Sequence, residues 1–186
     1  MSKRDNLDGV LSPFLRRQRF KAAAQFIRGR VLDFGCGVGL LGSLPSVDAY
    51  VGIDIDEEAL AIAAARNPAA RFYRPSHLSA IEGEQFDTVV ALAVIEHLPD
   101  PVDFLKQMRK FLGSRGRMVV TTPNPALDWA HGLGARVGIF AKESHDEHQS
   151  LMGRRELTRS AGAAGLRTTH FRRFLAGANQ LAILEP

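Results

Sequence analysis

Short apolar runs alternate with helix-length amphipathic segments along most of this chain. Apolar strands are predicted at 30–34, 50–55, 71–74, 86–92 and 117–122. Two further extended pieces, at 167–171 and 180–184, are expected to pair antiparallel because their connection is short. The alternation predicts an α/β fold, a Rossmann-like doubly wound sheet that is mostly parallel with an antiparallel C-terminal strand and has helices on both faces.

The helices are predicted from their caps and their apolar spacing, at about 12–27, 59–66, 100–112 and 154–164. The first is expected to begin at Ser12-Pro13, because proline suits the first helical position. Only a short helix is expected after the first strand, since Gly42, Ser43 and Pro45 follow it. The segment 113–116 is expected to turn the chain between the third long helix and the fifth strand.

Composition places the chain among ordinary globular proteins, with 45% hydrophobic and 24% charged residues. No run approaches the ~20 apolar residues of a membrane span, and the N-terminus has no apolar secretory signal. The single cysteine, Cys36, cannot form an internal disulfide, so a cytoplasmic location is expected. Basic residues cluster in 1–30 and 154–173; solvated helix faces are the favoured interpretation, with an anionic partner as the alternative. Aromatic residues do not alternate with these arginines, which disfavours nucleic acid.

The segment 31–39, Val-Leu-Asp-Phe-Gly-Cys-Gly-Val-Gly, carries the strongest functional signal. Alternate glycines after a buried strand allow a sharp turn and let backbone N–H groups approach a ligand. Asp54 ends the second strand, where a carboxylate can accept hydrogen bonds from both hydroxyls of a ribose. The set starting at Gly37 also fits a dinucleotide fingerprint, but Pro45 spoils the helix that this needs. Asp33 favours a ligand with an ammonium group over a pyrophosphate.

These residues resemble a known family. Asp33, Gly35, Gly37 and Gly39 with Asp54 look like motif I and the following acidic residue of class I S-adenosylmethionine-dependent methyltransferases. The segments 86–90 and 95–98, the latter Ile-Glu-His-Leu, resemble the family's fourth strand and its Glu-His-Leu segment. The resemblance covers roughly 28–186 and is to small methyltransferases of type 11 or type 12/23. It indicates the cofactor class and leaves the acceptor open.

The resemblance also implies a role for each cofactor-binding residue. The methionine part of S-adenosylmethionine would be lined by Gly35, Cys36, Gly37 and Gly39, with Asp33 close by. The ribose would be held by Asp54, and the adenine would lie against Ile55, with its edge facing Ser76 and His77. The sulfonium would be bordered by Leu92 and Ala93. The family often has an aspartate at the position of Ser76, so this adenine contact is expected to be weaker here.

The chain is accordingly predicted to be one methyltransferase domain over 1–186. It divides into an N-terminal helical cap (1–28), a cofactor-binding core (29–122), a substrate loop (123–150) and a C-terminal helix and strand pair (151–186). An arginine of the cap such as Arg19 can pair with the cofactor's carboxylate, although a simple covering helix is the favoured interpretation. The oligomeric state is not indicated.

The predicted reaction is O- or N-methylation of a small-molecule or glycan-like acceptor, which can be anionic, with S-adenosylhomocysteine as product. Similar methyltransferases place the segment around 143–149 over the substrate pocket, so His148 is the first candidate for base or acceptor partner and His145 the second. For His148, the alternative role of anchoring the loop through hydrogen bonds is about equally favoured. A metal is not expected, because Ala93 replaces the first glutamate of the segment that carries one in quinone-pathway relatives. The alternatives are an RNA or protein methyltransferase, a non-catalytic cofactor-binding module and, less favoured, an NAD-dependent oxidoreductase.

Overall fold

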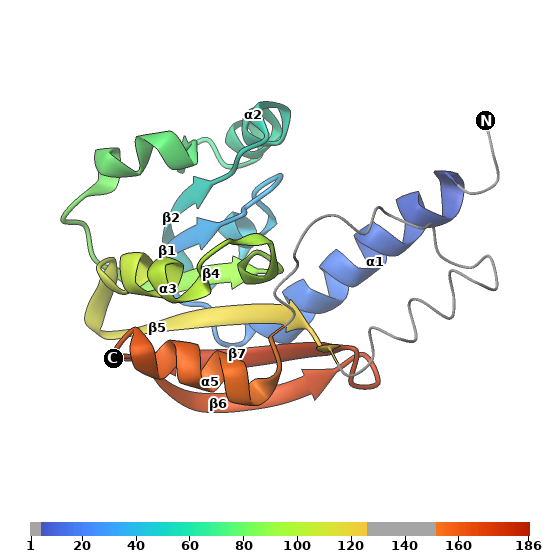
Figure 1. Ribbon diagram of the computed structural model, residues 1–186. Coiled ribbons are helices and arrows are strands. Elements are labelled where there is room, and N and C mark those ends of the chain that lie inside the picture. The colour runs from blue at the N-terminus through green and yellow to red at the C-terminus, as the bar shows by residue number, and fades with distance from the viewer. Residues whose placement is uncertain (1–4, 126–151) are drawn as a thin grey trace.

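The computed structural model describes residues 5–125 and 152–186, and in this part of the chain seven strands form one sheet in the order β3-β2-β1-β4-β5-β7-β6 (Figure 1). The strands are β1 (Gly29–Phe34), β2 (Val47–Ile53), β3 (Arg71–Tyr73), β4 (Phe86–Leu92), β5 (Leu112–Pro123), β6 (Arg167–Phe174) and β7 (Asn179–Glu185). β3, β2, β1, β4 and β5 are parallel, whereas β7 pairs antiparallel with both β5 and β6. The predicted doubly wound sheet with an antiparallel C-terminal end is confirmed.

Helices lie against both faces of this sheet. They are α1 (Asp5–Ala24), α2 (Glu57–Arg66), α3 (Pro101–Arg109) and α5 (Arg154–Ala163), with the 3₁₀ turns η1 (Leu40–Ser43), η2 (Pro75–Ile81) and η3 (Ile95–His97). Asp56 caps α2 by accepting hydrogen bonds from two backbone N–H groups of its first turn, at 3.0 and 3.1 Å. The cap and the acidic residues Glu57 and Glu58 of the first turn favour the start of this helix.

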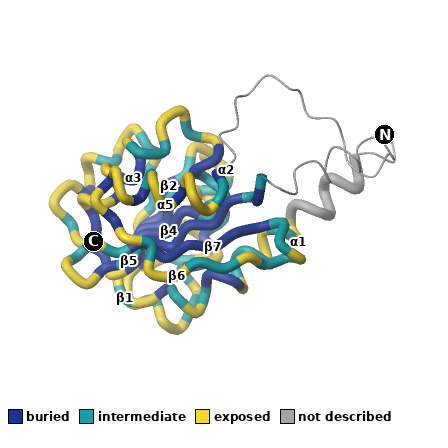
Figure 2. Tube along the Cα trace, turned by 60° about the horizontal axis from the view of Figure 1, so that its bottom comes forward, coloured by how far each residue is buried: buried dark blue, intermediate teal, exposed yellow. Residues whose placement is uncertain are grey.

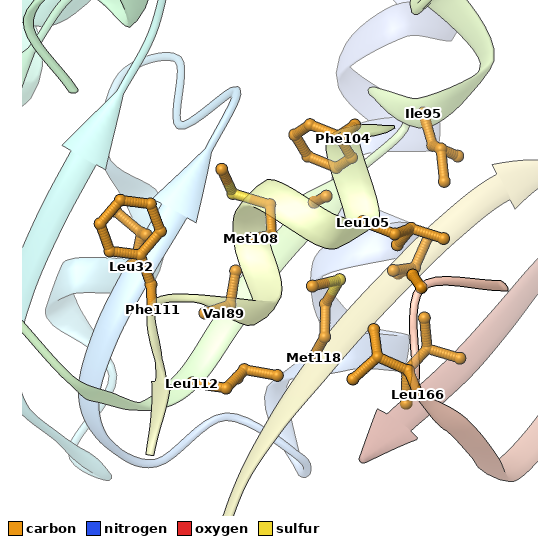
Figure 3. Packing of buried hydrophobic residues seen from close by; sticks show 14 of the residues in the cluster. Leu32, Val89, Ile95, Phe104, Leu105, Met108, Phe111, Leu112, Met118 and Leu166 are labelled. Carbon is orange, nitrogen blue, oxygen red and sulfur yellow. The ribbon is translucent and has the colours of Figure 1, made fainter. Parts of the chain in front are cut away.

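Successive residues of the central strands contribute to different cores, as the two-residue period of a strand requires. Leu32, Val89 and Met118 pack with α3 in one cluster (Figure 3), to which α5 also contributes. Their neighbours Val31, Val90 and Val119 pack with the end of α1 in the other. The central strands are therefore buried on both faces (Figure 2), which explains why they appear in the sequence as continuous apolar runs.

Two predictions of element boundaries are wrong. Helix α1 begins at Asp5 and contains Pro13, whereas the sequence suggested a start at Ser12-Pro13. The segment 113–116 does not separate a helix from a strand, because β5 already begins at Leu112, which pairs with Phe86. An irregularity in that ladder accommodates the extra residues, and at Gly116 a Cβ would lie 2.8 Å from the Phe86 carbonyl oxygen. Glycine is required there by the close approach of the two strands.

The strand order reverses between β1 and β4, so the carboxyl ends of these strands border the crevice in which open α/β sheets bind ligands. Within the described residues, no helix has both the length and the apolar character to cross a membrane. The cytoplasmic location and the division into four segments stay predictions.

Candidate functional site

A cavity of about 440 Å³ lies at the carboxyl ends of β1, β2 and β4, with α1 on its other side. Its lining comes from α1, the turn after β1, the end of β2 with the start of α2, and the end of β4. The lining residues are Arg16, Arg19, Phe20, Asp33, Gly35, Cys36, Gly37, Val38, Leu40, Leu41, Asp54, Asp56, Ala59, Leu92 and Ala93. The volume is in the range of small-molecule and cofactor sites.

The glycine turn forms the floor of this cavity. Gly35, Gly37 and Gly39 have φ angles of +78°, +50° and +69°, which side-chain-bearing residues rarely adopt. At Gly39 a Cβ would come within 2.9 Å of Ala63 on α2, so this glycine allows the turn to pack on the helix. At Gly37 a Cβ would meet nothing within 4 Å. Gly37 is thus the point of the turn where the backbone faces open space.

Asp33 lies beneath the turn as a buried carboxyl, with 3% of its surface exposed. It is held by the Tyr50 hydroxyl, which donates a hydrogen bond of 2.5 Å to Asp33 Oδ2. Burial raises the pKa of Asp33 to about 7; the Tyr50 hydrogen bond opposes this rise, and the Asp54 charge adds to it. A buried carboxyl of this kind gains from a cationic ligand in the cavity, because the ligand would stabilise its charged form.

Asp54 connects the end of β2 to the glycine turn. Its Oδ2 accepts a hydrogen bond of 2.6 Å from the Gly37 N–H, and its Oδ1 accepts one of 3.0 Å from the Asp56 N–H. A carboxylate has about four acceptor positions, so two remain for a ligand. The side chain is partly exposed at the cavity. This is the arrangement expected for a carboxylate that binds a diol.

Two arginines of α1 form the opposite side, and the sequence pointed to only one of them. Arg19 lines the cavity and donates a hydrogen bond of 2.9 Å from Nε to Asn179 Oδ1. Burial lowers the pKa of Arg19, and the Glu96 carboxylate opposes this effect. Arg16 lies one turn earlier on the same helix face, which is the signal that could have identified it. The cavity therefore has a carboxylate side and a guanidinium side.

Seven of the residues predicted to bind the cofactor line this cavity: Asp33, Gly35, Cys36, Gly37, Asp54, Leu92 and Ala93. Gly39 supports the turn from behind, as described above. Ile55 is 75% exposed beside the cavity, and Ser76 and His77 are exposed in η2. The cofactor-binding roles of all these residues, including those of Ile55, Ser76 and His77 against adenine, stay predictions.

The predicted catalytic residues His145 and His148 lie outside the described residues. Within the described part of the chain, no three His, Cys, Asp or Glu side chains are grouped so that they could hold a metal ion.

Sequence reasoning also gave no role to Glu96, which belongs to the Ile-Glu-His-Leu segment. It is 2% exposed, and its Oε2 atom has no hydrogen-bond partner. Burial raises the pKa of this carboxyl, while the charges of His97 and Arg19 oppose the rise. Glu96 is thus a buried carboxyl in η3, the turn that follows β4, and it interacts with the charge of Arg19.

The local geometry separates the two possible uses of the glycine turn. A dinucleotide site needs a helix whose N-terminus faces the pyrophosphate. Here the turn is followed by η1, a single 3₁₀ turn that ends at Ser43, and β2 begins at Val47. The buried Asp33 would also repel a pyrophosphate. The structure therefore favours the motif that begins at Asp33 over the dinucleotide fingerprint that begins at Gly37.

Comparison with known proteins agrees with this reading. A family model described as a methyltransferase domain matches residues 6–170. The chain belongs to this methyltransferase family. The predicted resemblance to class I S-adenosylmethionine-dependent methyltransferases is therefore confirmed.

The chain is similar in sequence to curated methyltransferases and similar in fold to solved structures. The ubiquinone biosynthesis O-methyltransferase of Aeromonas salmonicida is 31% identical over 150 residues, which cover 74% of this chain and 62% of the relative. The methyltransferase domain of bacterial CtHen1-C has a TM-score of 0.69 at 20% identity, covering 92% of this chain and 98% of that one. Magnesium protoporphyrin IX methyltransferase from Synechocystis PCC 6803, with bound SAH, has a TM-score of 0.63 at 18% identity, covering 97% and 82%. The two structural likenesses concern the fold alone.

Proposed function

We propose that the chain binds S-adenosylmethionine in this cavity and transfers its methyl group to an oxygen atom of a small-molecule acceptor. The observation that carries the proposal is the open space in front of Gly37, bordered by Asp33 on one strand and Asp54 on the next. Family membership supports the cofactor. Oxygen as the methylated atom is supported by the ubiquinone biosynthesis O-methyltransferases, although the chain spans only about three fifths of the two relatives at 31% and 32% identity.

The residues present fit this cofactor chemically. Exposed backbone at Gly37 provides close approach for the methionine part, and Asp54 has acceptor positions left for the ribose hydroxyls. Asp33 offers a buried negative charge to the ammonium group and the sulfonium. The Arg19 guanidinium lines the far side and matches the geometry of a carboxylate. The cavity thus offers complementary charge to every charged group of the cofactor.

S-adenosylmethionine, when bound, supplies a methyl group that is activated by the positive charge on sulfur. The protein's contribution is to hold an acceptor oxygen in line with the bond that breaks, and much of the rate enhancement of such a displacement comes from that alignment. Leu92 and Ala93 give this end of the cavity an apolar surface. The proton of the acceptor hydroxyl must leave, and His148, with His145 second, is the proposed base.

The first test is binding. Calorimetry with S-adenosylhomocysteine should give saturable binding of one ligand per chain, whereas NADH should give none. Binding of NADH without binding of S-adenosylhomocysteine would instead favour the interpretation of the glycine turn as a dinucleotide site. Binding of neither ligand by folded protein would remove the proposal altogether.

The second test is turnover. A panel of phenols and catechols, with amines and short RNA in parallel, should give methylated product from the hydroxyl compounds. Binding without turnover on any acceptor would identify a non-catalytic cofactor-binding module. His148→Ala should lower kcat with little change in cofactor affinity; full turnover by this variant would exclude His148 as the base.

A further inference from the structure

A partly buried contact joins α1 to the start of β7 at the border of the cavity. Asn179, which accepts the hydrogen bond from Arg19 Nε, is 4% exposed. It is the first residue of β7 and pairs with Pro123, the last residue of β5. The contact therefore fixes the Arg19 guanidinium relative to the sheet and not only relative to its own helix.

This contact leaves most of the guanidinium available. Arginine has five N–H donors in a rigid plane, and among the described residues the bond to Asn179 is the hydrogen bond that the structure gives to Arg19. The four N–H groups of Nη1 and Nη2 remain. Because the group is planar, holding Nε also sets the direction of the Nη atoms. A fork of parallel donors is the geometry that binds a carboxylate with two hydrogen bonds.

The electrostatic surroundings favour a charged Arg19 in this half-buried position. Burial works against the guanidinium charge, and the buried Glu96 carboxylate works for it. Glu96 has a carboxylate oxygen without a hydrogen-bond partner, and the structure records no ion pair between it and Arg19. Glu96 therefore stabilises the charge from a distance and does not occupy the donors of the fork.

We propose that Asn179 is a positioning residue for Arg19, holding its guanidinium in the orientation that binds the carboxylate of the cofactor's amino acid part. Recognition of that part then depends on the contact between α1 and the start of β7, two segments from opposite ends of the sequence. The proposal rests on the proposed function, because it requires the cofactor in this cavity.

The test compares two ligands by calorimetry. S-adenosylhomocysteine carries the amino acid part, whereas 5′-methylthioadenosine shares the nucleoside and the thioether but lacks it. Arg19→Ala should weaken S-adenosylhomocysteine binding about tenfold and leave 5′-methylthioadenosine unchanged. Asn179→Ala should weaken only S-adenosylhomocysteine, about fivefold, and the double variant should be no worse than Arg19→Ala.

Controls separate positioning from general loss of structure. Arg17→Ala removes an exposed arginine of α1 that does not line the cavity and should change neither affinity. In an Arg19→Lys background, which lacks the planar fork, Asn179→Ala should have no further effect. If Asn179→Ala fails to fold, Asn179→Ser carries the same expectation.

The outcomes that overturn the proposal are distinct. Equal weakening of both ligands by the Asn179 variants would make Asn179 a structural residue of β7, and unchanged S-adenosylhomocysteine affinity would remove its role. In either case the proposed function survives. Failure of the wild-type chain to bind either ligand would instead overturn the proposed function, and this inference with it.

Discussion

The two sides of the cavity originate in different ways. The sheet side is built from the continuous segment 33–54, in which a strand, a glycine turn and a second strand place Asp33, Gly37 and Asp54 together. The helix side consists of Arg16, Arg19 and Phe20 of α1. Two hydrogen bonds hold α1 against the last strands: Arg19 donates to Asn179, and Arg172 donates one of 2.7 Å to the Ala22 carbonyl. Local sequence fixes the first side, whereas the second exists only once the whole sheet has formed.

This difference assigns a separate task to each side. The sheet side offers backbone and carboxylates, which suit the nucleoside, the sulfonium and the ammonium group. The helix side offers guanidinium groups, which suit a carboxylate. Changes at Asp54 on the sheet side should therefore weaken every nucleoside ligand, whereas changes at Asp33 or on the helix side should weaken only those with an amino acid part.

The largest expected effect is that of Gly37→Val, which should weaken S-adenosylhomocysteine binding about a hundredfold, roughly 2.7 kcal/mol. A valine at a φ of +50° is strained, and its side chain would occupy the space that the ligand needs. Gly83→Val is the matched control, because Gly83 also has a positive φ and open space around it but does not line the cavity. Calorimetry on both variants separates strain from blocking: equal affinities would show that the turn is not the site.

The second effect is that of Asp54→Ala, which should weaken the same ligand about tenfold, roughly 1.4 kcal/mol. The variant removes the acceptor of the Gly37 N–H and the positions available for the ribose. Asp48→Ala changes an exposed aspartate of β2, the strand that Asp54 follows, outside the cavity and should have no effect. An Asp54→Ala protein with wild-type affinity for both S-adenosylhomocysteine and 5′-methylthioadenosine would contradict the ribose assignment.

The sequence predicted the sheet side of the cavity better than the helix side. Most of the residues predicted to bind the cofactor and found in the cavity lie in 33–54, because a glycine turn and a strand end are encoded by neighbours in the chain. Arg19 appeared only as a possible partner, and Asn179 not at all, since nothing near residue 179 indicates that it meets α1. The doubly wound sheet and its antiparallel end were predictable from alternating apolar runs. The start of α1 was not, because a proline inside a helix looks like a proline that begins one.

The third prediction concerns pH. With a pKa of about 7, Asp33 is largely protonated at pH 6 and ionised at pH 8. Since the ammonium group of the ligand favours the charged form of Asp33, S-adenosylhomocysteine affinity should rise about fivefold over this interval in wild-type protein. Asp33→Asn should remove that dependence, and calorimetry at both pH values checks it. An unchanged pH dependence in Asp33→Asn would assign the titration to another group.

Asp33 should also make the free energy of unfolding depend on pH, in the direction opposite to that of the ligand affinity. Because the folded-state pKa is raised above the unfolded value, the folded chain holds a proton that the unfolded chain has lost between about pH 4 and 7. The free energy of unfolding should therefore fall as pH rises through this window, and Asp33→Asn should make it flatter. Thermal unfolding of the two proteins between pH 5 and 8 measures the difference; parallel curves would contradict the buried position of Asp33.

The smallest effect on affinity should come from Asp56→Ala, although Asp56 lines the cavity. Its carboxylate already accepts two backbone hydrogen bonds as the cap of α2, so the expected cost is about 1 kcal/mol in the free energy of unfolding and less than twofold in S-adenosylhomocysteine affinity. Asp100→Ala removes the cap of α3, away from the cavity, and should cost a similar free energy of unfolding. If Asp56→Ala weakened binding several-fold while Asp100→Ala did not, the sheet side would extend to α2, and a third carboxylate would face the ligand.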